Sequence, residues 1–126
     1  MLENCKLGEL NTKLQEAAKK GYLNVLDRQV PIRSPRASLN TLLQSSAAMV
    51  AKKWVCLTDD YCRRDHIDAH YLMFIHDELD SEMLPEFAEP YSILCKQAMK
   101  DAGEYYKIRV EISGEIKIGG SWLETH

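Results

Sequence analysis

Two groups of polar residues have the types and the spacing that chemistry requires. In the first, Tyr71-Leu72-Met73-Phe74-Ile75 leads directly into His76-Asp77-Glu78. The apolar run is too short for a core helix and predicts a buried strand. Crowded or buried carboxylates are costly, so two adjacent ones at a strand end indicate a need for charge there. We interpret the triplet as the metal-binding tip of a hairpin, with Leu79–Met83 as the returning strand.

The second group is a stripe of Arg36, Asn40 and Gln44 at four-residue spacing. On a helix these three side chains share one face, beside an apolar face that includes Leu39, Leu43, Val50 and Trp54. Arginine and side-chain amides suit purine N3 and pyrimidine O2 in a DNA minor groove. A contact with those acceptors senses base-pair geometry rather than sequence. A plain solvated helix face remains the alternative interpretation.

Other possible metal ligands are less well placed. The cysteines (Cys5, Cys56, Cys62 and Cys95) contain no Cys-x-x-Cys pair, so we expect reduced thiols rather than a zinc site. His66 and His70 have the spacing to share a metal on a helix, with Asp65 and Asp68 nearby, but we expect a solvated helix end there.

The pattern along the chain predicts an α+β fold with an antiparallel sheet and packed helices. Leucines from Leu7 predict a helix that ends before Gly21, and Ser34-Pro35 precedes a long helix from about Ala37 into the low sixties. The other expected elements are a hairpin turning at Asp27-Arg28, a helix from Pro85 to Gly103, a strand over Lys107–Ile112, and a tail anchored by Trp122.

Composition excludes some functional classes. The chain has 126 residues, 45% of them hydrophobic, and a formal net charge of -3. That charge argues against a strongly basic nucleic-acid module, although a local basic face remains possible. A membrane helix needs about 20 apolar residues, and no apolar run in the sequence approaches that length. No signal peptide is recognisable. We therefore expect a cytoplasmic protein without a membrane partner.

Three motifs resemble one known family. Ile75-His76-Asp77-Glu78-Leu79 looks like motif C, the Val-His-Asp-Glu hairpin of family A DNA polymerases, the bacterial DNA polymerase I type and its phage relatives. The run from Ile32 to Ser45 is similar to the segment leading into the long palm helix of that family, most closely in the phage branch. Trp122 to His126 resembles the family's ending. The resemblance spans most of residues 7–126.

The resemblance implies a single C-terminal palm portion. Its parts would be residues 1–33, a helix and hairpin leading in; residues 34–66, the DNA-contacting helix; and residues 69–126, the motif C hairpin, a helix, a strand and the tail. Such a chain would occur in bacteria or be encoded by a phage.

Residue by residue, the resemblance implies a role for each site residue. Asp77 would be the catalytic carboxylate and a ligand of the paired Mg²⁺ ions, Glu78 would support that metal site, and His76 would lie near the primer terminus. Arg36, Asn40 and Gln44 would contact the minor groove of the primer–template DNA.

The same resemblance implies an incomplete catalytic site. The second aspartate (motif A) and the fingers helix that binds the incoming dNTP (motif B) are not found in this chain. We therefore expect inactivity alone, dependence on a complementary polymerase segment or chain, and self-association through uncovered apolar faces. A non-catalytic DNA-binding module and a structural remnant remain the alternatives.

Overall fold

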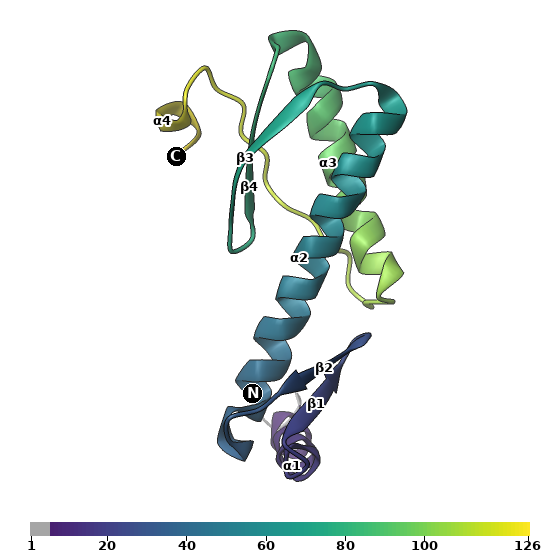
Figure 1. Ribbon diagram of the computed structural model, residues 1–126, viewed down its shortest axis with the longest axis vertical. Helices are drawn as coiled ribbons and strands as arrows, with labels where there is room; N and C mark the ends of the chain where they lie inside the picture. The colour runs from purple at the N-terminus through teal and green to yellow at the C-terminus, as the bar shows by residue number, and fades with distance from the viewer. Residues whose placement is uncertain (1–5) are drawn as a thin grey trace. The chain divides into compact units, whose positions relative to one another are not determined.

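The structure, a computed structural model, describes residues 6–126 and confirms the α+β prediction (Figure 1). Within these residues no helix combines the length and the apolar composition needed to cross a membrane. The elements in chain order are α1 (Leu7–Ala18), β1 (Tyr22–Val25), β2 (Arg28–Pro31), η2 (Pro35–Ala37), α2 (Ser38–Asp65), β3 (Ala69–Ile75), β4 (Glu78–Met83), α3 (Pro85–Tyr105) and α4 (Trp122–Thr125).

The chain divides into two compact units, Met1–Met49 and Val50–His126. In the first unit, α1 packs near a hairpin of β1 and β2. Leu14 and Ala18 lie four residues apart on one face of α1, and Leu23 and Val25 alternate on β1; all four are buried. Gly21, with a φ of 83°, turns the chain from helix to strand, as its position after the helix predicts.

The turn of the first hairpin lies one residue earlier than predicted. Val25 pairs with Arg28, so Leu26 and Asp27 form the turn instead of Asp27 and Arg28. Leu26 takes a left-handed backbone conformation, with a φ of 51°. The sequence contains no glycine at this turn that could have marked its position.

The second unit is built on α2 and α3, which run side by side (Figure 1). Val50 and Trp54, one helical turn apart on α2, pack with Ala98, Met99 and Ala102 of α3. A second cluster joins Cys62 of α2 to residues on the first half of α3, namely Tyr91, Leu94 and Cys95. The two helices thus share one buried apolar core.

The antiparallel hairpin of β3 and β4 follows α2 in the same unit. Its register runs from Ala69 opposite Met83 to Ile75 opposite Glu78, with an irregularity at Leu72, between Tyr71 and Met73. The predicted strand is confirmed, but its predicted burial is wrong for this chain. Leu72 is 56% exposed and Ile75 is 48% exposed. A strand with two apolar faces needs cover on both, and the hairpin is a two-stranded sheet.

Three predictions for the final third of the chain are wrong. Lys107–Ile112 forms no strand, because these described residues pair with no other strand. Gly103 does not end its helix, since α3 continues to Tyr105. Trp122 is 60% exposed rather than a buried anchor.

Candidate functional site

His76 and Asp77 are the two turn residues of the β3–β4 hairpin, and Glu78 is the first residue of β4. His76 takes a left-handed backbone conformation with a φ of 58°, which a two-residue hairpin turn requires at its first position. All three side chains are exposed. The tight turn therefore presents an imidazole and two carboxylates together at the tip.

The donor chemistry at the tip fits magnesium. Mg²⁺ binds oxygen ligands and is commonly held by one or two protein carboxylates together with substrate phosphates. Asp77 and Glu78 supply two such carboxylates, and their exposure leaves room for phosphate oxygens. Glu78 also contacts His126, whose Nε2 lies 2.5 Å from Glu78 Oε1.

Arg36, Asn40 and Gln44 lie in the first unit. Arg36 belongs to the single turn of η2, which leads into α2, whereas Asn40 and Gln44 lie one turn apart on α2 itself. All three are exposed, as a role in contacting DNA requires. Of the four residues on the predicted apolar face, Val50 and Trp54 are buried, but Leu43 is 58% exposed.

The structure adds two residues to the hairpin site, Asp80 and His126. Glu78, Asp80 and His126 form a group whose ligand atoms all lie within 4.8 Å of one another. Asp80 was detectable from sequence, because residues two apart on a strand share a face. His126 lies 48 residues from Glu78, and no local pattern places it there.

Electrostatics at this group follow from its contacts. Nδ1 of His126 lies 3.1 Å from the carbonyl oxygen of Trp122. That carbonyl and the Glu78 carboxylate raise the pKa of His126 above its ordinary value, because both stabilise the protonated ring.

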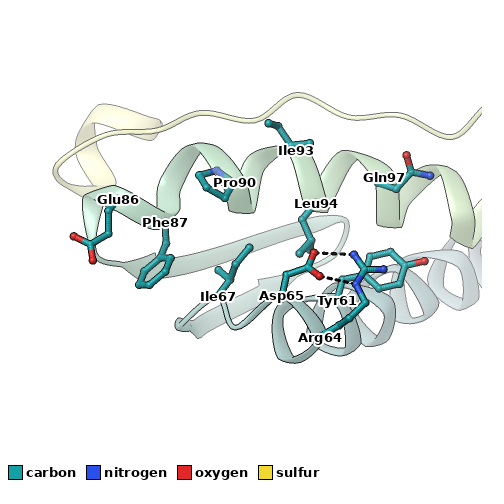
Figure 2. A pocket seen from close by; sticks show the side chains of 10 residues that line it. All are labelled: Tyr61, Arg64, Asp65, Ile67, Glu86, Phe87, Pro90, Ile93, Leu94 and Gln97. Carbon is teal, nitrogen blue, oxygen red and sulfur yellow. Dashed lines mark hydrogen bonds and ion pairs between the residues drawn. The ribbon is translucent and has the colours of Figure 1, made fainter.

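A groove of about 510 Å³ lies between the end of α2 and the first half of α3 (Figure 2). Its lining includes Ile67, Phe87 and Leu94. At one side Arg64 donates two hydrogen bonds to the Asp65 carboxylate, from Nε to Oδ1 at 2.6 Å and from Nη2 to Oδ2 at 2.7 Å. The Arg64 guanidinium lowers the pKa of Asp65 and keeps that carboxyl charged. The charges of Arg64 and Asp65 therefore satisfy each other at the side of the groove.

Among the described residues, the cysteines and the pair His66 and His70 do not belong to the group formed by Glu78, Asp80 and His126. Cys56, Cys62 and Cys95 are free thiols, and Cys5 lies outside the described residues. Burial raises the pKa of Cys62, and raises that of Cys95 to about 11, so both are protonated near neutral pH. His70 Nε2 lies 3.6 Å from Asp68 Oδ1, a contact at the exposed start of β3.

Comparison with known proteins shows which family the sequence matches. The sequence model of DNA polymerase family A matches residues 8–124. The DNA-directed DNA polymerase of Enterobacteria phage T3 is 34% identical over 116 residues, which cover 86% of this chain and 16% of that protein. The corresponding enzyme of Escherichia phage T7 is 31% identical over 116 residues, with the same coverage. The thermostable DNA polymerase I of Thermus filiformis is 31% identical over 125 residues, 89% of this chain and 14% of that protein.

A solved structure shows the same fold. The POL domain of Pol1 from M. smegmatis, in complex with DNA primer-template and dNTP, superposes with a TM-score of 0.68 at 23% sequence identity. The match covers 75% of this chain and 19% of that chain. The chain thus spans less than a fifth of the proteins named here. The family match extends over nearly all of the sequence, and the chain belongs to DNA polymerase family A.

Proposed function

We propose that this chain is the C-terminal palm portion of a DNA-directed DNA polymerase and that it works with a second polymerase segment. The observation that carries the proposal is the placement of His76, Asp77 and Glu78 at the tip of a tight hairpin, in a chain that the family model matches over residues 8–124. The palm assignment covers residues 1–126 as one functional part.

Asp77 and Glu78 are the proposed Mg²⁺ ligands at this tip. When bound, magnesium supplies positive charge that stabilises the phosphates and favours ionisation of the primer 3′-hydroxyl during nucleotidyl transfer. The chain holds the Asp77 carboxylate at an exposed turn, where DNA and a dNTP can approach it. A hairpin with two carboxylates needs further ligands, which we assign to the second segment and to the dNTP.

The histidine and the polar stripe complete the proposed roles. His76 precedes Asp77 in the turn, and we propose that it lies near the primer terminus. Arg36, Asn40 and Gln44 are exposed donors and acceptors that we assign to the minor groove of the primer–template DNA. We further propose that the assembled enzyme acts in the cytoplasm of a bacterial host.

Complementation tests the catalytic role. The chain is mixed with the part of the phage T3 polymerase that it does not match, and Mg²⁺-dependent primer extension is measured. We expect extension from the mixture but not from either part alone, and background extension with Asp77→Ala. Glu82→Ala, which removes an exposed carboxylate near the end of β4 away from the turn, is the control and should retain extension. Equal extension by the Asp77→Ala mixture would refute the catalytic assignment.

A non-catalytic DNA-binding module is the second candidate function, favoured by the exposure of the whole Arg36, Asn40 and Gln44 stripe. It predicts that the chain alone binds duplex DNA with an affinity that falls as salt rises. In fluorescence anisotropy at low salt, Gln44→Ala should weaken binding several-fold, whereas Gln29→Ala on β2 should not. If the chain neither binds duplex nor shows Mg²⁺-induced NMR shifts at Asp77, the structural remnant becomes the better interpretation.

A further inference from the structure

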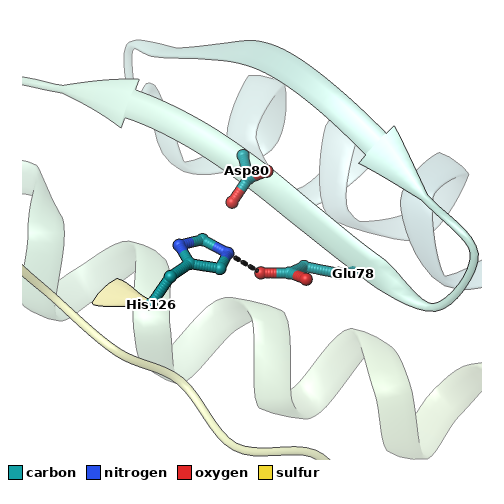
Figure 3. A group of neighbouring side chains, drawn as sticks. All are labelled: Glu78, Asp80 and His126. Carbon is teal, nitrogen blue, oxygen red and sulfur yellow. Dashed lines mark hydrogen bonds and ion pairs between the residues drawn. The ribbon is translucent and has the colours of Figure 1, made fainter. Parts of the chain in front are cut away.

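Glu78, Asp80 and His126 converge beside the hairpin (Figure 3). Glu78 and Asp80 share one face of β4, and His126 follows the single helical turn of α4. Their ligand atoms lie within 4.8 Å of one another. Metal–ligand distances of about 2.0–2.2 Å place opposite ligands roughly 4.2 Å apart, so small side-chain rotations would let the three atoms share one ion.

The orientation of the His126 ring is set by its own segment. Nδ1 lies 3.1 Å from both the Trp122 carbonyl oxygen and Thr125 Oγ1, and we assign the hydrogen to Nδ1 because a carbonyl can only accept. The imidazole also stacks on the Trp122 indole, with ring centroids 4.2 Å apart and an angle of 24° between the planes. These contacts direct Nε2 toward Glu78. Metal-ligating histidines commonly donate their other N–H to a backbone carbonyl in this way.

Asp80 provides a separate observation that points to a cation. Its Oδ2 atom is buried and has no hydrogen-bond partner among the described residues. A buried carboxylate oxygen without a partner is costly. One oxygen of Asp80 also lies within 4.8 Å of an oxygen of Glu78, so two negative charges are close together. A divalent ion between them would satisfy both charges. It would replace the proton in the contact between His126 Nε2 and Glu78 Oε1.

We propose that Glu78, Asp80 and His126 bind one divalent metal ion through two carboxylates and one imidazole. The site shares Glu78 with the magnesium site proposed at Asp77 and Glu78, but it adds Asp80 and a nitrogen ligand from the tail and does not include Asp77. Mixed oxygen and nitrogen donors favour ions such as Mn²⁺ over Mg²⁺, which prefers oxygen alone. Binding would also tether the tail to β4.

To test the site, Mn²⁺ is titrated into the full chain, and its binding is measured by electron paramagnetic resonance. Mn²⁺ is the probe because it is a harder ion than Zn²⁺ and binds the thiol of Cys56 poorly. We expect His126→Ala and Asp80→Asn each to weaken Mn²⁺ binding by at least about tenfold. His70→Ala and Glu82→Gln are matched controls that remove an exposed histidine and an exposed carboxylate from the same hairpin, and both should bind as the unaltered chain does.

Pulsed resonance on the unaltered chain gives a second readout that does not depend on the variants folding. A ¹⁴N coupling to Mn²⁺ that disappears in His126→Ala supports the site. The absence of any ¹⁴N coupling, or binding unchanged by His126→Ala, overturns it. If Mn²⁺ does not bind at this site, the proposed polymerase role is unaffected, because complementation and Asp77→Ala test that role. If complementation fails, the Mn²⁺ result is equally unaffected.

Discussion

At the scale of single residues, Tyr91 connects the hairpin to the helices. Its hydroxyl lies 2.7 Å from Ser81 Oγ, so one hydrogen bond joins α3 to β4. Tyr91 is 8% exposed, and burial raises the pKa of its hydroxyl well above the ordinary value. The hydroxyl therefore stays neutral and available for this bond throughout the physiological pH range.

Removing that hydroxyl should destabilise the fold. Tyr91→Phe leaves the ring in place but loses the bond to Ser81, at a cost of about 1 kcal/mol in the free energy of unfolding. Urea denaturation followed by circular dichroism measures the change. Tyr105→Phe removes a hydroxyl from an exposed tyrosine and should change stability little. Equal losses in both variants would show that the Ser81 contact contributes nothing specific.

The polar stripe of Arg36, Asn40 and Gln44 and the proposed metal-binding tip also belong to the residue scale. The sequence predicted their positions to different degrees. His76, Asp77 and Glu78 are consecutive, so a correct hairpin prediction brings them together. Asn40 and Gln44 follow from helical spacing, although Arg36 lies in η2 rather than in α2. The contact between His126 and Glu78 could not be predicted, because it depends on the path of the tail.

At the scale of elements, the segment after α3 shows why alternation alone does not make a strand. Ile108 and Ile112 pack against the core cluster of α2 and α3, and Ile116 packs against the second cluster. Their four-residue spacing differs from the alternation expected of a strand. Gly103 permits this packing, because a Cβ there would lie 2.7 Å from Ile112 Cγ1.

Because Gly103 lies so close to Ile112, we expect alanine at position 103 to destabilise the chain even though it favours a helix. Gly103→Ala gains about 1 kcal/mol of helix propensity but loses roughly 1–3 kcal/mol to overpacking, so we expect net destabilisation in urea denaturation. An Ile112→Ala background removes the 2.7 Å contact and leaves the Cβ of residue 112 as the nearest atom at 3.3 Å, so the same change should destabilise the chain much less.

Gly8→Ala on α1 serves as the control for the helix propensity. Nothing lies within 4 Å of a Cβ at Gly8, so its stability should not fall. If Gly103→Ala stabilises the unaltered chain, Ile112 moves aside without cost and the close contact is unimportant.

At the scale of the whole molecule, exposed apolar surface gathers on β3. Leu72, Met73, Phe74 and Ile75 are each more than 40% exposed. Contiguous apolar surface of this kind marks an interface or promotes association. Among the strands that the structure describes, β3 pairs with β4 alone, so its other edge is open as well. The relatives are several times longer than this chain, which agrees with a proposed partner segment that covers the strand.

Self-association of the chain alone follows from this surface. Sedimentation velocity should show an average mass that rises with concentration, and Leu72→Lys should reduce the effect. Val110→Lys, at a position 68% exposed in the segment after α3, is the control and should reduce it less. A chain that stays monomeric at all concentrations would contradict the prediction.

The sequence by itself determined the elements whose signals are local. The 28 residues of α2 follow from helical periodicity after Ser34-Pro35, and the β3–β4 hairpin follows from an apolar run that ends in a polar turn. The motifs on these elements, together with the ending from Trp122 to His126, carry the resemblance to the polymerase family, because each is a contiguous stretch of residues.

Only the tertiary structure decided which surfaces are covered and which distant residues meet. The burial of β3 depends on elements placed against it, and a strand over Lys107–Ile112 depends on a partner strand; neither is encoded in the segment itself. The meeting of His126 with Glu78 and Asp80 depends on the course of the whole tail. Contacts between distant residues are set by packing, and packing is a property of the assembled fold.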